Sequence, residues 1–164
     1  MKVGEHPVPK WGYSVLGLDA DTTAKASGRE LRVSPKVARE VCLAIKGMKL
    51  DEAKGFLGIV RQWKKAVPFR RHRKKVPHRH GLQLYAAGRY PVKAAEKILE
   101  VLESAESNAM YKGLDTERLR VVHAAACPGA KIKRYFPRAM GRATPQFETL
   151  CHVEIVLEQM GGGQ

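Results

Sequence analysis

Long apolar runs are missing from this sequence of 164 residues. No stretch approaches the roughly 18–20 uninterrupted apolar residues that cross a bilayer, so we expect no transmembrane helix. The first residues, MKVGEHPVPKWGY, also lack the apolar centre of a secretory signal. Cysteine is scarce, and the three that occur, Cys42, Cys127 and Cys151, are far apart and odd in number. This pattern favours a reducing compartment and free thiols over a disulfide framework.

Patterns that carry catalytic chemistry are missing as well. The sequence has no Gly-rich phosphate loop, no Gly-x-Ser-x-Gly and no paired carboxylates in an apolar setting. His72, His78 and His80 lie close together, but their spacing fits no common zinc pattern and no Cys pair lies near them. We therefore expect no metal, no cofactor and no enzymatic activity. A hydrolase that uses His123 or His152 is the weakest alternative.

Acidic residues are missing from two long windows. None occurs in the 43 positions 53–95, which hold twelve Lys and Arg, and none in positions 118–147, which hold seven. The whole chain has 30 Lys and Arg against 16 Asp and Glu, a formal charge of +14. Such an excess repels itself in a compact state, and a polyanion relieves the repulsion. Phosphate backbones fit this role better than an anionic membrane surface.

The length of the chain indicates one domain, residues 1–164. In its first half, the periodicity of apolar residues predicts two short helices. Ser34 caps the first helix, Pro35 suits its first position, and Gly47 ends it in the left-handed conformation. We expect Asp51 to cap the second helix, which faces the first across a short turn and carries its apolar face on Ala53, Phe56, Leu57 and Val60.

A third helix is predicted from Pro91 to Gly113. Its apolar stripe consists of Ala94, Ala95, Ile98, Leu99, Leu102, Ala105 and Ala109. Four glutamates at helical spacing form a separate face, which we expect to be solvated rather than to bind a cation. They are Glu96, Glu100, Glu103 and Glu106.

The segments around these helices are expected to be irregular. Residues 1–12 indicate an extended arm, residues 13–18 a short strand, and residues 19–28 a small polar loop. Residues 64–89 show no helical period and contain two Pro and two Gly, so they are predicted to form a long basic loop. A loop of about 25 residues in a compact domain is usually functional or ordered by a partner.

The last third of the chain predicts a long β-hairpin over residues 118–158. Leu119, Val121 and His123 alternate with their neighbours, and residues 150–157 are rich in β-branched and apolar side chains. The two strands would pair as antiparallel arms around a centre near Phe136, each reaching on the order of 50 Å. A two-stranded ribbon is only marginally stable in water, so another molecule is expected to support it.

Basic residues interleaved with aromatics and glycines suit RNA. Lys and Arg neutralise phosphates, and Tyr135 and Phe136 are placed to stack on unpaired bases, while Gly141 allows close backbone approach. The alternative for the two aromatics is simple packing of the hairpin tip on the domain. The cations predicted to bind RNA are Lys64, Lys65, Arg70, Arg71, Arg73, Lys74, Lys75, Arg79, Arg89, Lys131, Lys133, Arg134, Arg138 and Arg142.

Four motifs, in this order, carry a family resemblance. They are RVSPKVAREVCLAIKGMKLDEAKGFL (32–57), GRYPVKAAEKILEVLESAESNA (88–109), GLDTERLRVVHAAA (113–126) and KRYFPRAMGRATP (133–145). Together they resemble the universal large-subunit ribosomal protein family twenty-two, over nearly the whole chain. The basic insertion KKAVPFRRHRKKVPHRH is similar to archaeal and eukaryotic members, and the compact length favours the archaeal type.

The resemblance implies an α+β fold, with three helices packed on a small antiparallel sheet and a long extended β-hairpin. It implies a cytoplasmic constituent of the large ribosomal subunit, whose partners are ribosomal RNA, neighbouring ribosomal proteins and the nascent peptide. The alternative is a free RNA-binding or RNA-processing factor. The tip expected in the wall of the peptide exit tunnel comprises Ile132, Lys133, Arg134, Tyr135, Phe136, Pro137, Arg138, Ala139, Met140 and Gly141.

Overall fold

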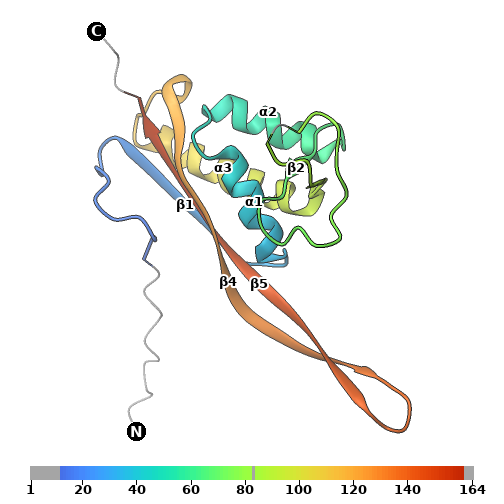
Figure 1. Cartoon of the computed structure of the whole chain (residues 1–164). Helices are drawn as coiled ribbons and strands as arrows, with labels where there is room; N and C mark the ends of the chain where they lie inside the picture. Colours follow the sequence, from blue (N-terminus) through green and yellow to red (C-terminus); the bar gives the residue numbers. More distant parts are fainter. Residues whose placement is uncertain (1–11, 83, 161–164) are drawn as a thin grey trace, which may run out of the picture.

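The computed structural model describes residues 12–82 and 84–160, and these contain a three-stranded antiparallel sheet. Its strands are β1 (Thr23–Leu31), β4 (Leu119–Pro137) and β5 (Ala143–Gln159), in the spatial order β1-β5-β4. The last strand in sequence therefore lies in the middle of the sheet. As Figure 1 shows, β4 and β5 run on together far beyond β1 as a twisted ribbon.

Three α-helices, counted over the described residues, cover one face of the sheet (Figure 1). Helix α1 (Pro35–Ile45) contacts β4, and α3 (Val92–Tyr111) contacts β1 and β5. Helix α2 (Leu50–Arg61) packs mainly on α3. One apolar cluster joins the buried faces of these helices to the proximal half of the sheet. The predicted α+β fold, with three helices on a small antiparallel sheet and a long hairpin, is confirmed.

The ends of α1 and α3 follow local sequence signals. Helix α1 begins at Pro35, and Gly47 just beyond it has φ +89°, as expected for a left-handed terminator. Ser34 precedes the helix, but its side chain makes no capping hydrogen bond. Helix α3 begins directly after Pro91, and Gly113 beyond its end has φ +75°. The predicted bounds of these two helices are therefore confirmed.

The start of α2 differs from the prediction that Asp51 caps it. The helix begins one residue earlier, at Leu50, so Asp51 lies within its first turn. The carboxylate of Glu52 instead accepts the backbone N–H of Lys49, at 3.4 Å. An acidic side chain at any position of the first turn interacts favourably with the helix dipole. The presence of Asp51 therefore indicated that a helix starts nearby but did not identify which residue is the cap.

Strand β1 overturns two predictions for the N-terminal part of the chain. Residues 13–18 are irregular rather than a strand, and the segment 19–28, predicted as a loop, contains the first half of β1. Its buried residues are small, because α3 approaches closely: a Cβ added at Gly28 would lie 2.6 Å from Val101 Cγ2. The arm predicted for residues 1–12 lies outside the described residues apart from Gly12.

The hairpin has the predicted length but a different centre. β4 and β5 have 19 and 17 residues, and 19 residues at roughly 3.3 Å each span about 60 Å. The connecting turn is residues 138–142, where Met140 and Gly141 have φ of 57° and 67°. The centre therefore lies a few residues beyond Phe136, since the chain needs left-handed residues to reverse and these come only after it.

Register shifts in β4, between Val121 and His123 and again between Pro128 and Lys131, break its alternation. Leu119 and Val121 are fully buried, but beyond the first shift Ala124 faces the core in place of His123. The prediction that side chains alternate regularly from Leu119 through His123 was therefore wrong, because a bulge between Val121 and His123 inserts one unpaired residue. Beyond the second shift the ribbon leaves the helices, and most of its side chains are exposed.

Candidate nucleic-acid interface

The basic loop, residues 64–89, is folded by its own contacts. Its ends pair as the short strands β2 (Val67–Pro68) and β3 (Gly88–Arg89), and the Arg79 N–H donates to the Ala86 carbonyl at 2.8 Å. Two of its own apolar side chains, Phe69 and Val76, are buried. The prediction that residues 64–89 form a loop without regular structure is thus wrong at the two ends of the loop, which pair as short strands.

Glu40 of α1 ties the basic loop to the helices. This carboxylate is 1% exposed, and it accepts the backbone N–H groups of Arg70 and Arg71 at 3.0 and 3.3 Å. Arg39 Nη1 donates to it at 2.7 Å. A buried charge is tolerated where it is fully hydrogen-bonded, as it is here. Glu40 cannot be identified from the sequence, because nothing local marks one helical glutamate as the partner of a distant loop.

Aromatic rings hold several of the loop's guanidinium groups. Arg70 lies over Tyr85 at 5.8 Å, and Arg79 lies over Tyr90 at 5.2 Å, both measured to the ring centroid. Arg89 similarly lies over Phe69. Each contact limits the freedom of a long side chain while leaving its N–H groups available. The loop therefore presents cations in partly fixed positions.

Every loop cation predicted to bind RNA is exposed. Within the described part of the chain, none of the nine forms an ion pair with a carboxylate. Their charge is therefore available to an outside anion. The nine are Lys64, Lys65, Arg70, Arg71, Arg73, Lys74, Lys75, Arg79 and Arg89.

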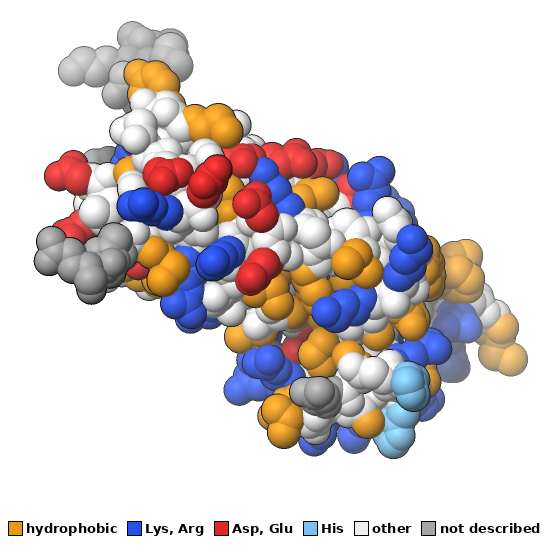
Figure 2. All heavy atoms as spheres, turned by 90° about the horizontal axis from the view of Figure 1, so that it is seen from above, with side chains coloured by type: hydrophobic (Ala, Val, Ile, Leu, Met, Phe, Trp, Pro, Cys, Tyr) orange, Lys and Arg blue, Asp and Glu red, His pale blue; other side chains and the backbone are white. Residues whose placement is uncertain are grey.

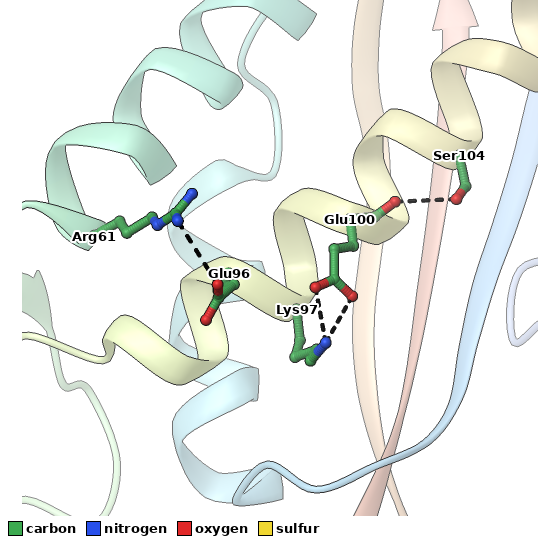
Figure 3. Close-up of polar contacts among 5 residues, drawn as sticks. All are labelled: Arg61, Glu96, Lys97, Glu100 and Ser104. Atoms are coloured by element: carbon green, nitrogen blue, oxygen red, sulfur yellow. Dashed lines mark hydrogen bonds and ion pairs between the residues drawn. The ribbon is translucent and has the colours of Figure 1, made fainter.

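Three of the four glutamates of α3, by contrast, have cationic partners from the protein itself. Figure 3 shows Glu96 facing Arg61 of α2 at 3.8 Å, and Glu100 bound by Lys97 at 2.7 Å. Glu106 is likewise paired with Lys54 of α2. The negative face predicted on α3 exists, but much of its charge is balanced locally. These acids therefore do not compensate the basic loop.

The hairpin carries the second group of predicted cations. Lys131, Lys133, Arg138 and Arg142 are exposed and make no ion pair within residues 12–82 and 84–160, while Arg134 lies 3.7 Å from Glu148. The Arg138 guanidinium covers one side of the Phe136 ring, at 5.3 Å.

Aromatic side chains near the tip are not packed on the body of the protein. Tyr135 is 64% exposed and Phe136 is 53% exposed. Met140 at the turn is 92% exposed. The alternative that Tyr135 and Phe136 pack on the domain is therefore not what the structure shows. Their rings are accessible to a flat partner such as a base.

The two cationic regions are separate in space. In Figure 1 the basic loop lies on the flank of the helices opposite β1, whereas the hairpin tip projects away from the helices. In Figure 2 acidic side chains lie mainly in the upper left of the view, and Lys, Arg and His line the lower and right margins. One compact ligand cannot touch both regions, so the arrangement fits an extended polyanion.

His123 belongs to a small polar cluster that is not arranged for hydrolysis. The Ser14 hydroxyl donates to Glu154 Oε2 at 2.8 Å and lies 3.0 Å from His123 Nε2. Since the hydroxyl proton points to the carboxylate, the histidine does not receive it as a general base. Burial, together with the nearby Lys46 charge, lowers the pKa of His123. The cluster fastens residues 12–18 to the sheet.

The other residues considered for chemistry are structural. His152 is buried, and its Nδ1 accepts the Glu30 backbone N–H at 3.1 Å. Burial raises the pKa of the Cys42 thiol to about 12 and that of Cys151 to about 11, so both stay protonated at neutral pH.

Among the helices that the structure describes, none has the length and apolar character needed to span a membrane.

The fold and its exposed cations define a class: a basic α+β protein with an extended hairpin, whose charge suits a polyanion such as RNA. Residues 26–158 match the family described as "Ribosomal protein L22p/L17e". The chain therefore belongs to this ribosomal protein family. It is 55% identical over 152 residues to the "Large ribosomal subunit protein uL22" of Methanopyrus kandleri, covering 91% of this chain and 96% of that protein.

Other archaeal relatives give the same result. The protein of the same name from Archaeoglobus fulgidus is 51% identical, over 93% of this chain and 98% of its own. That from Aeropyrum pernix is 46% identical, over 93% and 100%. The expected family and its archaeal type are confirmed.

Proposed function

We propose that this chain, as one domain over residues 1–164, is a structural constituent of the large ribosomal subunit in the cytoplasm. It binds ribosomal RNA and neighbouring ribosomal proteins and performs no catalysis. The observation that carries this proposal is the separation of charge. Three of the four glutamates of α3 are paired internally, while the nine loop cations and most hairpin cations face solvent without an ion pair among the described residues.

The basic loop acts as a preformed phosphate-binding surface. Glu40 fixes the backbone at Arg70 and Arg71, and three of the loop's guanidinium groups lie over aromatic rings, so less ordering is required when RNA binds. Preorganisation of this kind raises affinity by lowering the entropic cost of association. The loop neutralises phosphates, and this neutralisation helps to hold RNA segments together during assembly of the subunit.

The hairpin inserts between RNA segments, which support the ribbon that the protein leaves uncovered. Its tip, residues 132–141, lines the peptide exit tunnel and contacts the nascent peptide. Support comes from the exposure of Tyr135 and Met140 and from the projection of the tip beyond the helices. A surface with these aromatic and apolar groups suits both stacking on bases and passing contact with a peptide.

A salt-wash experiment tests the ribosomal role. A tagged copy of the chain is expressed in a related archaeon, and subunits are sedimented in rising salt. We expect the chain to stay with the large subunit until denaturing conditions, because many phosphate contacts are combined with an inserted hairpin. Release at moderate salt, together with free RNA, would favour a free RNA-binding or RNA-processing factor instead.

Photocrosslinking tests the contact with the nascent peptide. A photoreactive amino acid replaces Tyr135 at the tip, or, as a control, Tyr111 at the far end of α3, which is 94% exposed. Stalled ribosomes with a labelled nascent chain are then irradiated. We expect crosslinks to the peptide from position 135 and none from position 111. Absence of crosslinks from several tip positions would contradict the tunnel assignment while leaving RNA binding intact.

A further inference from the structure

A cleft of about 600 Å³ lies where the hairpin leaves the helices. The connection from β1 to α1 forms one wall, and the strands near the second register shift of β4 form the other. Its volume falls in the usual range for small-ligand sites. Residues that matter for its chemistry are Arg32, Ser34, Lys36, Lys131, Phe147 and Glu148.

The electrostatic character of the cleft is positive. Arg32, Lys36 and Lys131 contribute three cations against the single carboxylate of Glu148. Arg32 donates to both oxygens of that carboxylate, from Nε at 3.2 Å and from Nη2 at 3.0 Å. This hydrogen bonding lowers the pKa of Glu148, so the ion pair persists at neutral pH. Lys36 and Lys131 have no ion-pair partner in the described part of the chain, and they remain for an anionic ligand.

An aromatic ring and a hydroxyl complete the lining. Phe147 is 50% exposed although it is large and apolar, and its strand places it opposite Lys133. The Ser34 hydroxyl makes no capping bond to α1. The cleft thus combines a flat apolar surface, free cations and a hydrogen-bonding group, which are the features that recognise a nucleotide outside a helix.

We propose that this cleft binds a single extruded nucleotide of RNA, with its base stacked on Phe147 and its phosphate held by Lys36 and Lys131. The inference rests on the proposed RNA-binding function and adds a defined subsite to it. An acidic peptide would satisfy the cations but would not need the exposed ring. Because the cleft joins α1 to the hairpin, the nucleotide would also fix the direction in which the hairpin leaves the body.

Three RNA duplexes of one sequence test the proposal with the full chain. The first is fully paired, the second has one unpaired nucleotide, and the third has an abasic unit at that position. We expect wild type to bind the unpaired nucleotide about tenfold more tightly than the abasic unit, the size of one base stack. Phe147→Ala should abolish this preference, Phe147→Tyr should retain it, and Tyr111→Ala, outside the cleft, should leave it unchanged.

The cations of the cleft have a different expected signature. Lys36→Ala and Lys131→Ala should weaken binding of the intact and abasic bulges alike, because both carry the phosphate. Phe147→Leu keeps apolar volume without an aromatic face and serves where Phe147→Ala is poorly folded. It should lose the preference as well.

The possible outcomes distinguish failure of the nucleotide subsite from failure of the proposed RNA-binding function. Equal affinity for intact and abasic bulges, or a preference that survives Phe147→Leu, would overturn the subsite. Binding of the fully paired duplex through the basic loop would then be unaffected, and the proposed function would stand. Failure of all three duplexes to bind would overturn both.

Discussion

Replacing Glu40 by Ala is expected to release the start of the basic loop from α1. The substitution removes the acceptor of two backbone N–H groups, those of Arg70 and Arg71, and the partner of Arg39. A hydrogen bond to a charged group contributes about 1.5–3 kcal/mol. Water reaches part of the vacated site, because Arg39 is 35% exposed and the loop lies at the surface. We therefore expect a loss of about 3 kcal/mol in the free energy of unfolding.

Glu40→Gln is the graded variant. Its amide oxygen can still accept one loop N–H, but the charge that binds Arg39 is gone, so a loss of about 1–2 kcal/mol is expected. Glu100→Ala is the control, because that glutamate is exposed and its one ion-pair partner within residues 12–82 and 84–160 is Lys97 on the same helix. Exposed pairs of this kind contribute under about 1 kcal/mol.

Urea unfolding of the purified chain measures these differences, and hydrogen exchange locates them. The Arg70 and Arg71 amides should exchange faster in Glu40→Ala, while amides in the centre of β5 change much less. RNA affinity should fall about tenfold, since binding must then order the loop. An unchanged urea midpoint with fully protected loop amides would refute the role assigned to Glu40.

Further perturbations test separate parts of the structure. Exchanging five loop cations for Ala should reduce the slope of log affinity against log salt by about 4, and an unchanged slope would show that the loop binds no phosphate; the five are Arg70, Arg71, Arg73, Lys74 and Lys75. The lowered pKa of His123 means that the unfolded chain binds the proton more readily, so the free energy of unfolding should fall as the pH drops below about 6.5, the ordinary pKa of a histidine. His123→Gln should remove this part of the pH dependence in urea titrations, and a fall on the alkaline side instead would contradict the assignment. Gly28→Val should lose about 1–3 kcal/mol through overlap with Val101, and Val101→Ala should recover part of that loss in the double variant. Replacing residues 133–147 by Asn-Gly should leave the thermal midpoint of the isolated chain nearly unchanged while RNA affinity falls, because the helices do not cover that ribbon; loss of folding would show that the tip is structural.

Local signals predicted the parts of the fold that depend on neighbours in sequence. Pro35 and Gly47 mark the ends of α1 because their backbone preferences act on the residues around them. Strand β1 was missed for the opposite reason. Two of its three buried residues, Ala24 and Ala26, have weak strand preference, and the strand is held by pairing with β5 and by close contact with α3. Nothing within the segment itself shows either partner.

The candidate interface likewise has features that local sequence predicts and features that depend on distant residues. Acid-free windows identify the cations, because charge is a property of each residue. The order of the loop could not be predicted, since it arises from Glu40 on a helix and from rings such as Tyr85 and Tyr90 at the far end of the loop. Likewise, periodicity placed the glutamates on one face of α3 but did not show that α2 supplies Arg61 and Lys54 as partners.

The central position of β5 has a consequence for synthesis of the protein. Thr23 in the first strand pairs with Glu158, and β5 also pairs with β4 along most of its length. A ribosome makes β5 after every other element that the structure describes, so the sheet beneath the helices cannot close until β5 has been synthesised. A prematurely terminated product would expose two unpaired strands and an open core. Synthesis of β5 is thus a condition for closing the sheet, and the order of the strands keeps β1 and β4 apart until β5 lies between them.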